Sequence, residues 1–126
     1  MKQDNEYWMK QALIQADKAL QLKEVPVGAI IVKDNKVIGR GYNQKEQLND
    51  PTAHAEIVAI TAAANTLEDW RLNDCILYVT KEPCSMCAGA ILNARLKLVV
   101  FGCYDEEEGC CGSLYQLCGD PRFKTK

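Results

Sequence analysis

Histidine is almost absent from this sequence: among 126 residues only His54 carries an imidazole. An excess of charge of one sign is also lacking, since 15 Lys and Arg against 17 Asp and Glu leave a formal net charge of −2. This balance excludes a generally basic surface for phosphate backbones, so any nucleic-acid contact must be a local patch. No apolar run approaches the roughly 18 residues of a membrane-spanning helix, and the polar residues 1–6 do not resemble a signal peptide. We therefore expect a cytoplasmic protein with no membrane segment.

Cysteine, by contrast, occurs seven times. An odd number of cysteines without a secretion signal argues against a disulfide framework and favours metal binding or thiol chemistry. Length and composition are those of one globular domain, because 126 residues with 48% hydrophobic and 25% charged side chains suffice for a single core. The sequence contains no internal repeat or linker, so residues 1–126 are expected to form one domain.

Hydrophobic periodicity predicts an α/β protein. Near the N-terminus Met9, Leu13, Ala16 and Leu20 recur at spacings of four, three and four residues, which predicts one apolar helix face. The β-branched segment 27–32 is typical of a strand covered on both faces, and it pairs with the next strand in an antiparallel hairpin. Strands that alternate with helices further along predict a layered domain with a mixed sheet. The expected elements are helices at 4–22, 53–67, 85–95 and 113–118, and strands at 27–32, 37–42, 75–80 and 96–101.

Two short motifs stand at the starts of two predicted helices. The first contains His54 and Glu56, and the second, Pro-Cys-Ser-Met-Cys, contains Cys84 and Cys87. Two cysteines three residues apart in a first helical turn present both sulfurs to one side, where they can bind one ion at about 2.3 Å. His54 could supply a third ligand. The positive end of each helix dipole favours the thiolate and the neutral imidazole that a metal requires.

Three ligands of this kind predict a catalytic zinc site. Thiolate and imidazole favour zinc, and three protein ligands leave the fourth tetrahedral position open. Water in that position has its pKa lowered toward neutral and becomes a nucleophile. Glu56 lies two residues from His54, about 200° around an ideal helix, so we do not expect it to bind the metal. We expect it to carry protons between the water, the substrate and a departing amine.

Each of these residues alone has a simpler interpretation. A lone C-x-x-C motif is often a redox pair or half of a structural zinc site, and a lone histidine or glutamate is most often structural or solvated. The pairing of H-x-E with P-C-x-x-C favours catalysis, because it is the signature of zinc deaminases. Cys110 and Cys111 stand apart from this pair. With Cys103 and Cys118 they could form a second metal site, but adjacent cysteines bind one ion poorly, so we expect packing thiols.

A wider match places these motifs in a family. The chain resembles the cytidine deaminase superfamily, and within it the bacterial tRNA-specific adenosine deaminases, over about residues 5–120. The segments that carry the resemblance are EVPVGA at 24–29, GYN at 41–43, DPTAHAE at 50–56, LYVTKEPCSMCAGA at 77–90 and VVFG at 99–102. The combination of the third and fourth segments is much more specific than H-A-E alone.

The resemblance implies hydrolytic conversion of adenosine to inosine at the wobble position of a tRNA anticodon, with release of ammonia. It implies one zinc ion per subunit, held by His54, Cys84 and Cys87, and Glu56 as the proton shuttle. An anticodon stem-loop presents unstacked bases, so one base can enter a pocket without melting a duplex. Asn43 corresponds to a residue that binds the flipped base, although it could equally cap a strand end. The other expected substrate-binding positions are Val27, Ala29, the backbone of Ala55, and Asp105.

The resemblance also implies a three-layer α/β/α sandwich of the cytidine deaminase type and a homodimer. Family members usually continue with a further strand and a C-terminal helix, so either these elements lie outside this chain or its RNA binding differs. Arg122, Lys124 and Lys126 are the better candidates for phosphate contacts, while Lys33, Lys36, Arg40 and Lys45 follow the hairpin. Two rival functions stay open: a deaminase of free cytosine, guanine or nucleosides, and an inactive zinc-stabilised RNA-binding protein.

Overall fold

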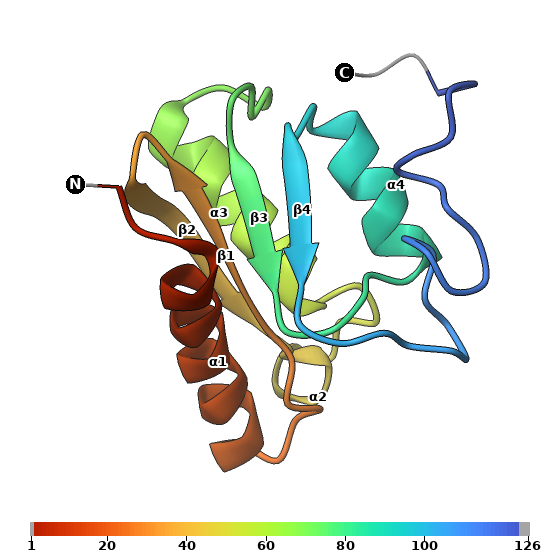
Figure 1. The fold of residues 1–126 in the computed structure, drawn as a ribbon. Helices are drawn as coiled ribbons and strands as arrows, with labels where there is room; N and C mark the ends of the chain where they lie inside the picture. The colour runs from red at the N-terminus through yellow and green to blue at the C-terminus, as the bar shows by residue number, and fades with distance from the viewer. Residues whose placement is uncertain (1, 124–126) are drawn as a thin grey trace.

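A four-stranded mixed sheet organises residues 2–123, the part of the chain that the computed structural model describes (Figure 1). The strand order is β2-β1-β3-β4. β1 (Gly28–Lys33) and β2 (Lys36–Tyr42) form an antiparallel hairpin, and β3 (Ile76–Val79) also runs antiparallel to β1. β4 (Leu98–Phe101) runs parallel to β3. The predicted mixed sheet with an N-terminal hairpin is therefore confirmed.

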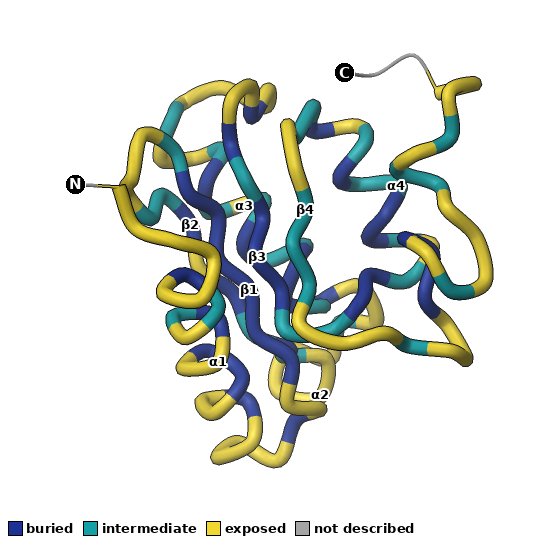
Figure 2. Tube along the Cα trace, in the orientation of Figure 1, coloured by how far each residue is buried: buried dark blue, intermediate teal, exposed yellow. Residues whose placement is uncertain are grey.

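Helices cover both faces of this sheet. α1 (Asn5–Gln21) lies on one face, while α3 (Ala55–Leu67) and α4 (Ser85–Asn93) lie on the other (Figure 1). Successive side chains of β1 alternate between the two layers, as strand geometry requires. Ile30 packs in the cluster under α1, and Ile31 packs in the cluster under α3. β1 is consequently buried on both sides (Figure 2), and the predicted three-layer α/β/α arrangement is confirmed.

The buried face of α1 agrees only in part with the predicted one: Met9 and Ala16 face the core as expected. Leu13 and Leu20, expected to face the core, are 52% and 58% exposed. A Cβ atom at Gly28 of β1 would collide with the backbone of Ala12 and Ala16, so α1 lies too close to the sheet for large side chains along this line. The short distance between α1 and β1 therefore requires mainly small residues on the buried face of the helix. The buried residues of α1 are Trp8, Ala12, Gln15, Ala16 and Ala19.

The start of α3 lies equally close to β2. A Cβ atom at Gly41 would collide with the carbonyl oxygen of Ala55 and with the backbone nitrogen of Ala59. Ala55, Ala59 and Ala63 form the helix side that packs in the core. This close packing fixes the first turn of α3 on the sheet, and His54 is the N-cap of that helix.

The structure adds one short helix and replaces another. α2 (Lys45–Leu48) was not predicted; the buried carboxylate of Glu24 accepts hydrogen bonds from the backbone nitrogens of Glu46 and Gln47 at its start, at 3.1 and 2.7 Å. The helix expected at 113–118 is wrong. That segment forms turns closed by an isolated antiparallel bridge between residues 111 and 116. The other predicted elements begin and end within two residues of those observed.

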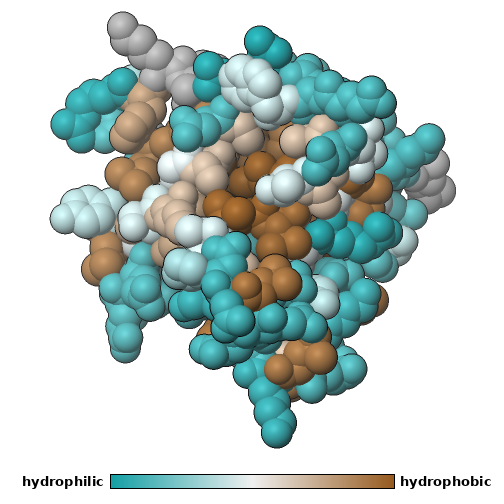
Figure 3. Space-filling model, turned by 180° about the vertical axis from the view of Figure 1, so that it is seen from behind, coloured by the Kyte–Doolittle hydropathy of each residue, from teal (hydrophilic) through white to brown (hydrophobic). Residues whose placement is uncertain are grey.

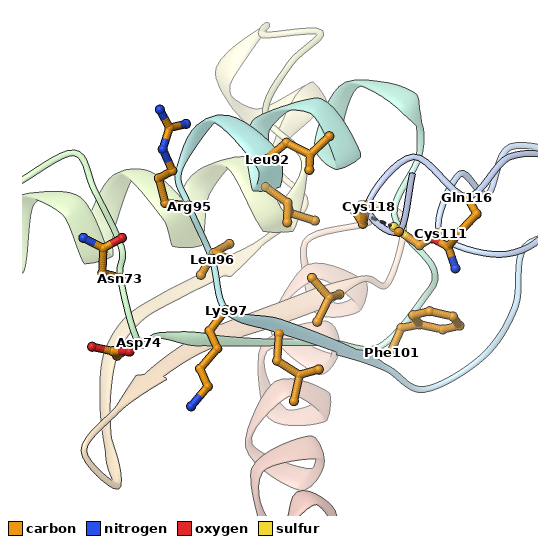
Figure 4. A pocket seen from close by; sticks show the side chains of 14 residues that line it. Asn73, Asp74, Leu92, Arg95, Leu96, Lys97, Phe101, Cys111, Gln116 and Cys118 are labelled. Atoms are coloured by element: carbon orange, nitrogen blue, oxygen red, sulfur yellow. Dashed lines mark hydrogen bonds between the residues drawn. The ribbon is translucent and has the colours of Figure 1, made fainter. Parts of the chain in front are cut away.

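Within residues 2–123 no strand pairs with the outer edge of β4. A cavity of about 790 Å³ lies beside this edge (Figure 4). Its wall is made by β4, the end of α4 and the segment around Cys118. None of the helices in this part of the chain is long and apolar enough to cross a membrane.

Candidate active site

The two helix starts bring three potential metal ligands together. His54 is the N-cap of α3, Cys84 is the N-cap of α4, and Cys87 lies in the first turn of α4. The Nδ1 atom of His54 lies 3.6 Å from the Sγ atom of Cys84 and 3.5 Å from the Sγ atom of Cys87. All three ligand atoms lie within 4.8 Å of one another. His54 thus joins two cysteines that follow it by 30 and 33 positions in the sequence.

These separations fit a tetrahedral zinc ion. Zinc bonds of about 2.3 Å to sulfur and about 2.0 Å to nitrogen, at a tetrahedral angle, place the two ligand atoms about 3.5 Å apart. The observed distances between His54 Nδ1 and the two sulfurs agree with that value. Glu56 does not belong to the cluster. The donor set therefore fits zinc with three protein ligands.

The local electrostatics prepare Cys84 to be a thiolate. A hydrogen bond from the Cys87 thiol, helped by the backbone N–H groups of Cys87 and Met86 at the start of α4, lowers the pKa of Cys84 to about 5. The same thiol pair raises the pKa of Cys87, and burial raises it further. One thiol of the pair is therefore ionised near neutral pH before any metal binds.

Glu56 lies in the first turn of α3 and is only 4% exposed. Burial raises its pKa to about 7, with a smaller contribution from the negative charge of Cys84. Glu56 lines a cavity of about 140 Å³ together with His54 and Cys84. A carboxyl group that titrates near neutral pH beside a metal site is suited to proton transfer.

The cavity contains some of the predicted substrate-binding residues. Val27, Asn43 and Asp105 line it, whereas Ala29 and Ala55 do not. Ala29 packs in the core under α3. The backbone N–H of Ala55 donates a hydrogen bond of 3.1 Å to Oδ1 of the buried Asn43, so this donor is already used inside the protein.

Glu82 is a buried residue that the sequence analysis missed. Its side chain is 3% exposed, and its carboxylate accepts hydrogen bonds from the backbone nitrogens of Asp105, Cys111 and Ser113 and from the hydroxyl of Ser113. Burial acts to raise the pKa of Glu82, but these hydrogen bonds outweigh it and hold the pKa below its ordinary value. The sequence does contain one indication of this role: Glu82 stands directly before the Pro-Cys motif. A charged residue between a buried strand and a metal ligand needs hydrogen-bond partners inside the protein.

The remaining cysteines lie outside this cluster. Cys110 and Cys111 pack against Ala88 of α4. The sulfurs of Cys111 and Cys118 are 3.2 Å apart (Figure 4). Among residues 2–123, the only group of three metal-binding side chains is the one at His54. This arrangement agrees with the expectation of packing thiols.

The basic residues are dispersed. Lys33 and Lys36 pair at the turn of the hairpin, the end away from Val27 and Asn43. Arg122 forms an ion pair with Asp120 at 2.6 Å, and residues 124 and 126 lie outside the described part of the chain. Two other lysines, Lys45 and Lys81, line the cavity itself.

This combination of a zinc-compatible cluster and an adjacent buried glutamate is characteristic of hydrolytic deaminases. A model of the MafB19-like deaminase family matches residues 3–117. A tRNA-specific adenosine deaminase of Streptococcus pyogenes serotype M18 is 45% identical over 124 residues, which cover 98% of this chain and 78% of that protein. The chain therefore belongs to the MafB19-like deaminase family, among the tRNA-specific adenosine deaminases.

Other similarities extend this comparison. The chloroplastic tRNA(adenine(34)) deaminase of Arabidopsis thaliana is 50% identical over 113 residues, or 90% of this chain, but those residues span only 9% of that protein. A solved structure from studies of A-to-I editing by tRNA:A34 deaminases superposes with a TM-score of 0.91 at 40% identity, covering 96% of this chain and 93% of that one. A guanine deaminase from Bacillus subtilis superposes with a TM-score of 0.79 at 43% identity, covering 81% of this chain and 66% of that one. The deaminase fold of the cytidine deaminase type is thereby established.

Proposed function

We propose that this protein hydrolyses the exocyclic amine of adenosine at the wobble position of a tRNA anticodon and so forms inosine. The observation that carries the proposal is the convergence of His54, Cys84 and Cys87 beside the buried Glu56. The names of the relatives and of the A-to-I editing structure supply the substrate class. The expected location is the cytoplasm.

His54 through Nδ1, and Cys84 and Cys87 through their sulfurs, would hold one zinc ion per chain. When bound there, zinc supplies Lewis-acid activation of a water molecule near neutral pH. Glu56 accepts a proton from the attacking water and donates it to the departing amine. Because Glu56 is enclosed by protein, its proton is exchanged with the substrate rather than with bulk solvent.

Asn43 orients the base in this proposal. Its Oδ1 atom accepts the N–H of Ala55, so the Nδ2 group is the part of the amide that remains to donate to a substrate. Ala55 therefore acts by fixing the amide, and Ala29 supports the pocket from the core cluster to which Val27 also belongs. Val27 and Asp105 bound the nucleotide at the cavity wall.

The RNA contacts in this proposal begin at the mouth of the cavity. Lys45 and Lys81 line it and carry positive charge. The side chain of Lys81 is 41% exposed, and its ammonium nitrogen lies 3.1 Å from the carboxylate of Asp105. These two lysines would meet the phosphates that flank the flipped nucleotide, with Arg122 as a further contact.

A homodimer is part of the same proposal. An apolar hollow lies between α3 and α4, lined by Ile57, Ile60, Trp70 and Ala94 among others. Figure 3, seen from the side on which α3 lies, shows hydrophobic side chains gathered at the centre of this face. Trp70 is 53% exposed beside the guanidinium groups of Arg71 and Arg95. An apolar patch with an exposed tryptophan is typical of protein interfaces.

The principal rival is deamination of a free base. The structural similarity to the guanine deaminase specifically favours this alternative, because the same zinc ligands and glutamate would serve it. Purified protein should be incubated with an RNA anticodon stem-loop that carries adenosine at the wobble position, and separately with guanine and cytosine. We expect inosine in the stem-loop, identified by mass spectrometry. Turnover of a free base without inosine would overturn the proposed substrate.

A substitution in Glu56 tests the chemistry. Glu56→Gln should retain zinc and fold but lose about 10²- to 10⁴-fold in rate, the usual contribution of proton transfer. Glu6→Gln is the matched control, because that residue lies exposed on α1 in an ion pair with Lys10. A Glu56→Gln variant that deaminates at the wild-type rate would refute the role of Glu56.

A further inference from the structure

Glu82 connects the segment that leads into the metal cluster with a later segment of the chain that borders the cavity. It stands two residues before Cys84, so it belongs to the segment that leads into the metal cluster. Its carboxylate is bound by residues 23 to 31 positions further along the chain. That later segment, 105–113, contains Asp105 and Glu108, which line the mouth of the cavity. The segment is called here the rim segment.

The rim segment is built around this carboxylate. Oε1 accepts the N–H of Asp105 at 3.0 Å, and Oε2 accepts the N–H groups of Cys111 at 3.0 Å and Ser113 at 2.8 Å. The hydroxyl of Ser113 donates to Oε1. A Cβ atom at Gly109 would collide with the carboxyl carbon of Glu82, so the segment passes directly over it.

Backbone bonds reinforce the connection from the same short stretch. The nitrogen of Glu82 donates to the carbonyl oxygen of Cys103 at 2.9 Å, and the nitrogen of Cys110 donates to the carbonyl oxygen of Pro83 at 2.8 Å. The side chain of Glu82 adds acceptors on both sides of Cys110, since it binds Asp105 before that residue and Cys111 and Ser113 after it.

We propose that Glu82 is a positioning residue: its buried carboxylate holds the rim segment at a fixed place relative to Cys84 and thereby sets where Asp105 and Glu108 meet the substrate. This inference rests on the proposed deaminase function. Glu82 is not one of the metal ligands, and although it borders the cavity, both of its carboxylate oxygens are engaged by the rim segment. Its loss should therefore weaken substrate binding rather than slow the chemical step.

Glu82→Gln is the informative variant. The side-chain amide of glutamine has one acceptor oxygen, and its NH₂ group can only donate. The least costly orientation places the NH₂ group at the Oε1 position. There Ser113 Oγ can accept a hydrogen bond from it, and only the N–H of Asp105 loses its acceptor. We expect unchanged zinc content, kcat within about twofold, and a rise in KM for the anticodon stem-loop of about tenfold, comparable to the loss of one hydrogen bond. Amide exchange measured by NMR should quicken at Asp105 while Ser113 stays protected.

Two further variants keep the test decisive. Ser113→Ala removes the hydroxyl donor but keeps the three backbone bonds, so it should give a smaller rise in KM and also serves if Glu82→Gln does not fold. Asp17→Asn is the control, because the carboxylate of Asp17 binds the side chain of Gln21 on the exposed surface of α1. It should leave KM unchanged.

Failure of the positioning role of Glu82 and failure of the proposed deaminase function give different results. An unchanged KM in folded, zinc-loaded Glu82→Gln would overturn the positioning role, and so would a variant whose activity falls only in proportion to lost zinc. A wild-type protein that leaves the stem-loop unmodified would contradict the proposed function instead. In that case unchanged amide exchange at Asp105 in the variant would still refute the hold on the rim segment.

Discussion

Gly41→Ala tests whether the close contact between β2 and α3 maintains the site. The added Cβ would meet the Ala55 carbonyl oxygen and the Ala59 nitrogen, which are both backbone atoms and cannot rotate away. Overpacking a core costs about 1–3 kcal/mol, and rigid obstacles place this case in the upper half of that range, at about 2–3 kcal/mol. For a domain of this size each kcal/mol shifts Tm by about 3–5 °C, so we expect a Tm lower by about 6–15 °C.

Calorimetry of the zinc-loaded variant, with zinc content determined on the same sample, is the assay. Because α3 must move outward from its first turn, the position of His54 changes as well, and zinc affinity should fall together with Tm. Gly89→Ala is a matched control for which we expect an increase in stability rather than a decrease. Apart from neighbouring residues and the backbone of α4 itself, no atom lies within 4 Å of a Cβ at this position. Replacing glycine by alanine there should therefore stabilise the helix by about 1 kcal/mol. A Gly41→Ala protein with wild-type Tm and zinc affinity would refute the packing argument.

Two further predictions concern the ends of helices. Asp4 is the N-cap of α1, and its carboxylate accepts the N–H of Tyr7 at 2.9 Å. Asp4→Ala should lower the free energy of unfolding, measured by chemical denaturation, by about 1 kcal/mol, and Asp4→Asn should lower it less. Equal stability of all three proteins would contradict the capping role. In the zinc-free protein, iodoacetamide at pH 6 should alkylate Cys84 before any other cysteine, as peptide mapping would show. The depressed pKa leaves Cys84 ionised above pH 5, so its rate should fall as the pH drops through that value. Preferential labelling of the exposed Cys103 at pH 6 would count against this ionisation.

The sequence predicted those features that depend on local pattern. β1 reads as a strand buried on both sides because nearly all of its residues are apolar, and the structure confirms it. The His54 and Cys84 motifs could be identified because metal ligands at helix starts have characteristic spacings. The structure brings them together at distances that fit one ion.

Features that depend on a distant neighbour could not be predicted in the same way. The buried face of α1 is set by Gly28, a residue outside the helix, so the predicted stripe was right for Met9 and Ala16 but wrong for Leu13 and Leu20. Glu82 has no periodic signature, since its partners are supplied by a segment without regular secondary structure. The use of the Ala55 N–H by Asn43 likewise depends on how β2 ends beside α3.

X-ray absorption spectroscopy of the intact protein after titration with zinc tests the central claim most directly. The account predicts one zinc ion per chain, with two sulfur ligands at about 2.3 Å and the remaining nitrogen or oxygen ligands at about 2.0 Å. Cys87→Ser should reduce the sulfur count to one. A zinc ion surrounded by four protein donors, or a chain that binds no zinc at all, would contradict the account.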